Sequence, residues 1–170
     1  MADRISAAQR SRNMARIRGT NTAPERVFRS GLHRAGFRFR LHSRALPGRP
    51  DLVLPKYYAV AFVHGCFWHR HPGCADAATP KTRSDFWVQK LNGNRRRDAR
   101  QIRALLKAGW RVLIVWECAL ETPSLESSTI AHSARWLRSK SQYEEIPAGA
   151  KSFVRATLHR ALHARAQAVH

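Results

Sequence analysis

The sequence lacks long apolar runs, and it contains few cysteines. Its 170 residues include no uninterrupted apolar stretch of about 18, the length that a membrane-spanning helix needs. The basic segment 1–19 lacks the apolar core of a secretory signal. We therefore expect a cytoplasmic protein with no membrane partner. Its three cysteines, an odd number, argue against a disulfide framework and leave metal ligation or buried thiols.

Acidic residues are also scarce, because 11 Asp and Glu stand against 31 Lys and Arg, a formal net charge of +20. The basic residues comprise 25 arginines and 6 lysines, and the planar guanidinium suits phosphate and guanine contacts. A hydrophobic content of 44% is sufficient for a packed core. This composition predicts a compact protein that binds nucleic acid. A ribosome-associated or RNA-associated protein remains an alternative.

The apolar periodicity predicts a mixed α/β layer fold with one main domain. Helices are expected at 6–18, 22–35, 85–90, 95–107 and 126–138, and strands at 37–41, 51–54, 58–63 and 111–116. We divide the chain into a basic N-terminal helix within 1–20, a domain over 21–140 and a basic tail over 141–170. The tail fits either an amphipathic helix or disorder.

A cluster of cysteine and histidine predicts a zinc site. Its members, Cys66, His71, Cys74 and Cys118, use every cysteine of the chain. Three thiolates and one imidazole form a complete tetrahedral zinc set. The segment 64–83 has few apolar residues and is expected to be a loop held by such a clamp. The alternative is three buried thiols and a solvated His71.

A second cluster has the composition of a nuclease site. Asp51 begins one expected strand and His64 ends the next, so the two side chains should lie at adjacent strand ends. Asp51 can hold Mg²⁺, while His64 and His69 titrate near the pH at which protons must move. Glu25 can hold a metal-bound water. Each residue also has a simpler explanation, because Glu25 completes a capping box and the others suit turns or loops.

Large aromatic residues lie beside the expected zinc loop. Phe67 and Trp68 stand between two of the zinc ligands, and Phe86 and Trp87 follow further on. Exposed aromatics among arginines can stack on bases or wedge between them, whereas buried ones would belong to the core. We expect at least one of Phe67 and Trp68 to be exposed.

Several blocks of the sequence together resemble the very short patch repair (Vsr) DNA mismatch endonuclease family. They are SRNM at 11–14, LPGRPD at 46–51, HGCFWH at 64–69, the stretch 82–87 and GWRVLIVWEC at 109–118. The resemblance covers roughly residues 4–140. It implies a restriction-endonuclease-like mixed sheet flanked by helices, and a bacterial, nucleoid-associated enzyme. The implied reaction is a Mg²⁺-dependent nick on the 5′ side of the T in a T:G mismatch, such as arises from deaminated 5-methylcytosine.

The resemblance also implies a role for individual residues. Asp51 would bind the metal, His69 would activate the water, His64 would assist at the phosphate and Glu25 would support metal-bound water. Val63 stands where the family often has Thr, so only its backbone carbonyl can be a metal ligand. Structural zinc would be held by Cys66, His71, Cys74 and Cys118. Mismatched DNA would be entered from the major groove by Phe67, Trp68 and Trp87 and from the minor groove by Met14 and Ile17.

These expectations define a DNA endonuclease that acts as a monomer on double-stranded DNA, with mismatch-repair proteins as possible partners. The alternative is a zinc-containing DNA-binding module without cleavage activity. Asp51, His64 and His69 discriminate the two hypotheses, because binding alone requires none of them.

Overall fold

The computed structural model describes residues 20–147, which form a five-stranded mixed sheet in the order β1-β2-β3-β4-β5. The β1–β2 and β2–β3 pairs are antiparallel, while the β3–β4 and β4–β5 pairs are parallel. Their bounds are Arg40–Leu41 for β1, Leu52–Leu54 for β2, Ala59–His64 for β3, Arg111–Trp116 for β4 and Tyr143–Ile146 for β5. The predicted mixed sheet is confirmed.

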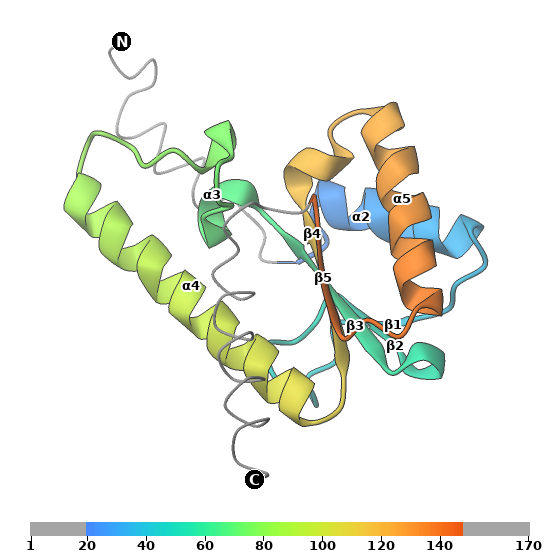
Figure 1. Cartoon of the computed structure of the whole chain (residues 1–170). Helices are drawn as coiled ribbons and strands as arrows, with labels where there is room; N and C mark the ends of the chain where they lie inside the picture. Colours follow the sequence, from blue (N-terminus) through green and yellow to red (C-terminus); the bar gives the residue numbers. More distant parts are fainter. Residues whose placement is uncertain (1–19, 148–170) are drawn as a thin grey trace, which may run out of the picture.

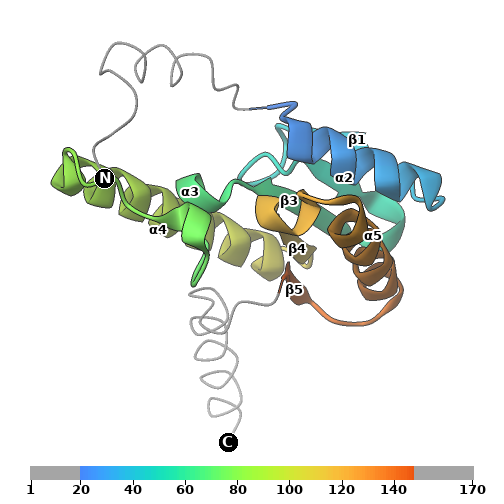
Figure 2. The same ribbon diagram turned by 90° about the horizontal axis from the view of Figure 1, so that it is seen from above.

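Helices cover both faces of the sheet (Figure 1). The helices α2 (Ala23–Arg34) and α5 (Pro123–Arg138) lie on one face, and the long α4 (Ser84–Lys107) lies on the other. The view from above shows the same three layers (Figure 2). The short α3 (Cys66–His69) follows β3 directly, and 3₁₀ turns occupy Pro55–Tyr57, Ala75–Ala77 and Glu117–Leu120. None of the helices within 20–147 is long and apolar enough to cross a membrane.

The two faces of the sheet carry separate apolar cores. Phe28 and Leu32 of α2 pack with Leu137 of α5 on one face, and Ile102 and Leu105 of α4 pack on the other. Every residue of β4 is buried. Its continuous apolar sequence is therefore explained by a strand covered on both faces.

The N-terminus of α2 is closed by a capping box that also buries Glu25. The Thr22 hydroxyl accepts a hydrogen bond from the Glu25 backbone N–H at 3.4 Å, and the Glu25 carboxylate accepts from the Asn21 N–H at 2.8 Å and the Thr22 hydroxyl at 3.0 Å. Glu25 is only 4% exposed. The local cap thus fixes a carboxylate at the edge of the interior.

A buried arginine joins the sheet to α5. Arg111, at the start of β4, donates from its guanidinium to the carbonyls of Trp136, Leu137 and Ser141. Its guanidinium carbon also lies 4.3 Å from the centre of the Trp136 ring. The Arg111 guanidinium therefore joins the last turn of α5 to the loop before β5.

Several helix predictions need correction. The expected helices at 85–90 and 95–107 are one continuous helix, α4, and the full burial of Leu91 anchors the segment around Gly93. The expected loop 64–83 begins with the one-turn helix α3. Helix α5 starts at Pro123 rather than 126, with Thr122 as its cap. The expected helix 6–18 lies outside the described residues.

Two strand predictions also change. The expected strand 37–41 is reduced to Arg40–Leu41, because Phe37 turns into the core after α2. Residues 143–146 were assigned to the tail, but they form β5, which pairs with β4. The expected division at residue 140 therefore precedes a strand of the sheet, and residues 148–170 lie outside the described range.

Candidate active site and metal centre

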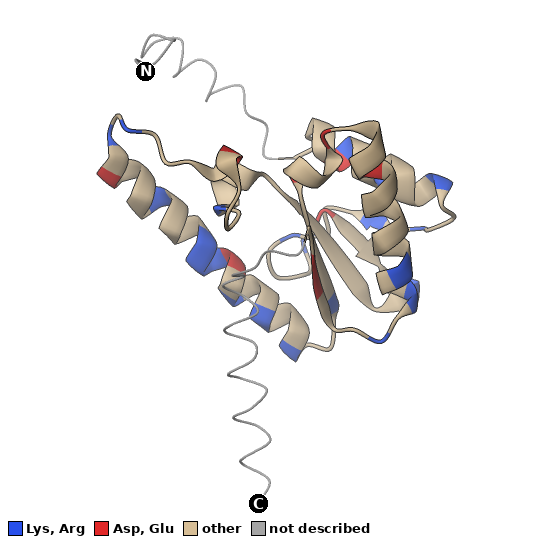
Figure 3. Ribbon diagram, turned by 45° about the horizontal axis from the view of Figure 1, so that its top comes forward, with Lys and Arg blue, Asp and Glu red and all other residues tan. Residues whose placement is uncertain are grey.

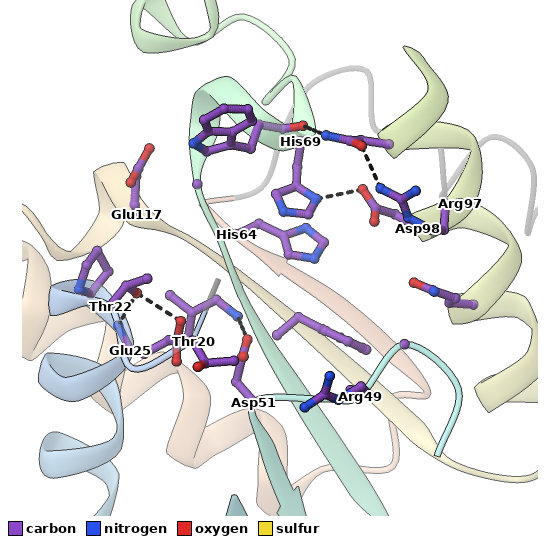
Figure 4. Close-up of a pocket in the computed structure, with 18 of the residues that line it drawn as sticks. Thr20, Thr22, Glu25, Arg49, Asp51, His64, His69, Arg97, Asp98 and Glu117 are labelled. Atoms are coloured by element: carbon purple, nitrogen blue, oxygen red, sulfur yellow. Dashed lines mark hydrogen bonds and ion pairs between the residues drawn. The ribbon is translucent and has the colours of Figure 1, made fainter. Parts of the chain in front are cut away.

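One pocket of about 910 Å³ contains all four predicted catalytic side chains. They are Glu25, Asp51, His64 and His69. The pocket opens between α2, the carboxyl end of β3 and α4, and the close-up shows Asp51 and Glu25 on one side and the two histidines on the other (Figure 4). Asp51 and His64 thus share a pocket, but each belongs to a different group of side chains.

The first group consists of Glu25, His42 and Asp51. One oxygen of Asp51, Oδ2, accepts a hydrogen bond from the Val63 N–H at 2.8 Å. Burial raises the pKa of Asp51 from 3.8 to about 7 against the opposing effect of this hydrogen bond, and the Glu25 carboxylate raises it further. A buried carboxylate pair with such a pKa favours a bound cation.

The second group consists of His64, His69 and Asp98. The two imidazoles stack with 3.9 Å between ring centroids and 5° between planes. His69 Nδ1 lies 2.6 Å from Asp98 Oδ2, which assigns the proton on Nδ1 to this contact and directs Nε2 away from it. The pair has the arrangement of an oriented base.

His64 differs from its sequence-based expectation of a group that titrates near neutrality. Its ring is 7% exposed, and burial, followed by the charge of His69, lowers its pKa well below 6.5. His64 is therefore a neutral imidazole in this structure.

The four predicted zinc ligands meet at the end of α3. Their ligand atoms lie within 4.8 Å of one another. The Sγ atoms of Cys66 and Cys118 each lie 3.4 Å from His71 Nδ1, close to the separation of about 3.5 Å that two ligands on one tetrahedral zinc ion have. The donor set and its spacing fit zinc.

The surroundings of this cluster are those of a metal-binding site. Burial raises the pKa of the Cys66 thiol, and burial raises that of Cys118 to about 11. A bound metal would displace these protons. The imidazole of His71 stacks on Trp116 at 4.3 Å, so the ring orientation is set by β4.

The three predicted DNA-contacting aromatics form one cluster, of which Trp68 lines the pocket. Phe67 lies 5.1 Å from Trp68 and 5.3 Å from Trp87, and Trp68 lies 6.2 Å from Trp87. Phe67 and Trp68 are half-buried, whereas Trp87 is buried with 8% exposure. Lys90 Nζ lies 5.6 Å above each of the two tryptophan rings. Met14 and Ile17 lie outside the described residues.

Three residues of the site escaped sequence reasoning. Asp98 orients His69, His42 lies between Glu25 and Asp51, and Glu117 Oε1 accepts from the Cys66 N–H at 2.6 Å. Asp98 had a signal, because it is the acidic residue within the basic run 95–103. For His42 and Glu117 no local pattern in the sequence pointed to the site.

A mixed sheet that carries a carboxylate group and an oriented histidine pair in one basic-rimmed pocket is typical of a metal-dependent nuclease. Comparison with known proteins supports this class. The family model of the DNA mismatch endonuclease Vsr matches residues 2–76.

Characterised relatives extend the match. The Type II nicking enzyme V.XorIIP of Xanthomonas oryzae pv. oryzae is 51% identical over 120 residues, 71% of this chain and 88% of that protein. The DNA mismatch endonuclease Vsr of Escherichia coli K12 is 49% identical over 120 residues, 71% of this chain and 76% of that protein. The Type II nicking enzyme V.NmeAIP of Neisseria meningitidis is 39% identical over 125 residues, covering 74% and 89% of the two chains.

The chain belongs to the Vsr family of DNA mismatch endonucleases. The resemblance, the fold class and the prediction of an endonuclease are thereby confirmed.

Proposed function

We propose that this protein nicks one strand of double-stranded DNA on the 5′ side of the T in a T:G mismatch, by Mg²⁺-dependent hydrolysis. The observation that carries the proposal is the meeting of Asp51, Glu25 and the His69–Asp98 pair in one pocket of a Vsr-family chain. Hydrolysis of a phosphodiester needs a proton acceptor and stabilisation of the growing negative charge, and the two groups divide these tasks.

The histidine group accepts the proton of the attacking water. Asp98 holds His69 through Nδ1, so Nε2 is the nitrogen that accepts a proton from the attacking water. The stacked His64 is neutral and donates a hydrogen bond to a phosphate oxygen. Asp98 then stabilises the imidazolium formed on His69.

The carboxylate group fits the cation. Asp51 Oδ1 and the Val63 carbonyl would hold Mg²⁺, and Glu25 would act through a bound water. When bound, Mg²⁺ supplies positive charge at the scissile phosphate and lowers the pKa of a bound water. The Val63 N–H keeps the Asp51 carboxylate oriented for this purpose.

The DNA is held by the aromatic cluster and by cationic side chains. The half-buried Phe67 and Trp68 wedge beside the mismatch from the major groove, and the buried Trp87 packs against Phe67 to support them. Met14 and Ile17 approach from the minor groove. Lysines and arginines lie along α4 (Figure 3), and two of them, Lys90 and Arg97, line the pocket. Zinc at Cys66, His71, Cys74 and Cys118 keeps the aromatic segment in place.

A nicking assay tests the proposal. Zinc-loaded protein is incubated with Mg²⁺ and a labelled duplex that carries one T:G pair, beside duplexes with T:A and C:G at that position. We expect one nick beside the mismatched T, and a loss of at least 100-fold in rate for Asp51→Ala, because that variant lacks the metal-binding carboxylate.

The matched control is Asp85→Ala, which removes an exposed carboxylate outside the pocket. Binding of the mismatched duplex without any nick would instead indicate the zinc-containing DNA-binding module. Equal nicking of matched and mismatched duplexes would refute the mismatch specificity.

A further inference from the structure

His42 lies between the two carboxylates of the pocket, although the family resemblance implies no role for it. Its Nδ1 is 3.8 Å from Asp51 Oδ1 and its Nε2 is 4.0 Å from Glu25 Oε2. Both distances exceed those of a hydrogen bond. Within residues 20–147, Nε2 is buried and has no hydrogen-bond partner. The ring is therefore placed beside the carboxylates without being bonded to either.

The backbone at His42 adopts an energetically unfavourable conformation. Its φ of 48° lies in the left-handed region, which non-glycine residues adopt uncommonly and at about 1 kcal/mol or more. The His42 N–H donates to the Asp51 carbonyl at 3.2 Å, directly after the β1–β2 pairing of Leu41 with Leu52. The same hydrogen bond that fixes the turn thus keeps the imidazole next to Asp51.

The oxygen that faces His42 is the one that Asp51 has available. Asp51 Oδ2 is committed to the Val63 N–H, so Oδ1 is the oxygen left for a cation. Each oxygen of Glu25 already accepts one hydrogen bond in the α2 cap, Oε1 from the Thr22 hydroxyl and Oε2 from the Asn21 N–H, so Glu25 retains acceptor capacity for a water but is less available as a direct ligand. A cation at Asp51 Oδ1 therefore has the His42 Nδ1 as its nearest nitrogen ligand among the members of this group.

We propose that His42 supplies an imidazole nitrogen to the cation site of Asp51 and thereby biases this site toward Mn²⁺, Co²⁺ and Ni²⁺ over Mg²⁺ and Ca²⁺. Among these three ions the affinity for a site with a nitrogen ligand rises from Mn²⁺ through Co²⁺ to Ni²⁺, whereas Mg²⁺ and Ca²⁺ are hard cations that take oxygen ligands. The inference rests on the proposed function, because that proposal assigns the cation to Asp51. It adds a specificity-determining residue for the cation.

Two substitutions separate the ligand from the fold. His42→Gly removes the imidazole and suits the positive φ, and His42→Asn keeps a short polar side chain that tolerates the left-handed region. The matched control is His33→Asn, which changes an exposed histidine of α2 far from the carboxylates. Melting temperatures establish that each variant folds.

The measurement is Mn²⁺ binding to the zinc-loaded, full-length protein without DNA, followed by electron paramagnetic resonance. Mg²⁺ binding is measured by its competition with Mn²⁺. Asp51→Ala defines the binding that belongs to this site, because Mn²⁺ held by His64, His69 and Asp98 persists in that variant. We expect both His42 variants to bind Mn²⁺ about tenfold more weakly at the Asp51 site. The Mg²⁺ competition constant should change less than the Mn²⁺ constant, and His33→Asn should match the wild type.

Unchanged Mn²⁺ binding in both folded His42 variants would overturn the inference, and so would an equal loss of affinity for Mn²⁺ and Mg²⁺. Neither result would bear on the proposed nicking function. Failure of the proposed function would look different, because Asp51→Ala would then alter neither Mn²⁺ binding nor the nicking of T:G duplexes.

Discussion

The contact between His69 Nδ1 and Asp98 Oδ2 decides which nitrogen of the imidazole faces the pocket. Asparagine in place of Asp98 presents an amide that can donate, which favours the opposite tautomer and turns Nε2 into a donor. We expect Asp98→Asn to lower the single-turnover nicking rate by about 100-fold or more, with little change in DNA affinity. Rate and affinity are measured separately, by quench kinetics and by fluorescence anisotropy.

Asp85→Asn is the control for this substitution, because Asp85 is an exposed carboxylate in the first turn of the same helix. A full rate in Asp98→Asn would show that His69 is not the proton acceptor, since a base with its accepting nitrogen turned away cannot take the proton.

The raised pKa of Asp51 gives the protein without Mg²⁺ a pH-dependent stability. The folded state keeps the proton between pH 3.8 and about 7, so the stabilisation by proton binding is complete below the lower value and is lost as pH rises through the higher one. Asp51→Asn cannot ionise and should therefore gain stability relative to the wild type as pH rises. The difference is on the order of 4 kcal/mol at pH 8, measured by urea unfolding.

This comparison is made at pH 4, 6 and 8 in buffer without added Mg²⁺. A constant difference across the range would show that Asp51 ionises in the folded protein as readily as in the unfolded chain. Added Mg²⁺ should stabilise the wild type at pH 8 and leave Asp51→Asn nearly unchanged, because the bound cation replaces the proton.

The residue types in the sequence predicted the kind of chemistry at the site better than they predicted which side chains contact one another. Asp51, His64 and His69 were proposed because their types suit a nuclease, and the structure places all three in one pocket. The four thiol and imidazole groups were proposed because they use every cysteine, and the structure brings them together. His42 and Asp98 were missed because their partners are brought to them by β1 pairing and by the docking of α4 on the sheet. Such proximity is a tertiary property that spacing along the chain does not encode.

At the scale of the elements, Arg111 is the strongest candidate for a stabilising residue away from the pocket. Arg111→Met removes three hydrogen bonds and leaves the carbonyls at the end of α5 without their charged donor. We expect a loss of about 3 kcal/mol in the free energy of unfolding. Urea denaturation followed by circular dichroism measures it.

Arg103→Met, on the exposed side of α4, is the matched control and should cost far less. If the two variants were equally stable, the Arg111 contacts would contribute nothing beyond those of a surface arginine.

Elements with a strong apolar period were predicted well, and those held by context were not. The buried strands β3 and β4 and the capped helix α2 follow directly from local sequence. In β5, the charged Glu144 and Glu145 interrupt the apolar pattern of a strand. The segment is a strand because it pairs with β4. The expected break between residues 90 and 95 is absent, because burial of Leu91 and Ala99 on both sides stabilises the helix through Gly93.

At the scale of the whole molecule, the cluster of Cys66, His71, Cys74 and Cys118 and the pocket are built on the same residues. Trp116 stacks on His71 and lies edge-on to His64 at 5.4 Å, and Glu117 lines the pocket while accepting from the Cys66 N–H. We therefore expect Cys118→Ala to lower the bound zinc, the thermal stability and the nicking rate together. Metal analysis, thermal melting and the nicking assay measure the three quantities.

Ser127→Ala, on the exposed face of α5, is the control. A full complement of zinc in Cys118→Ala would refute the ligand assignment. Full nicking by a zinc-deficient variant would show that the pocket holds its shape without the metal.

The one-turn helix α3 directs four consecutive residues to three destinations. Cys66 belongs to the metal cluster, Phe67 and Trp68 to the aromatic cluster and His69 to Asp98. Each residue of a helix turns the next by about 100°, so an insertion or deletion here would rotate every later side chain out of its place. Changes of length in this segment should therefore be far less tolerated in a library of variants than substitutions. The helical phase of α3 therefore determines which of the three sites each side chain reaches.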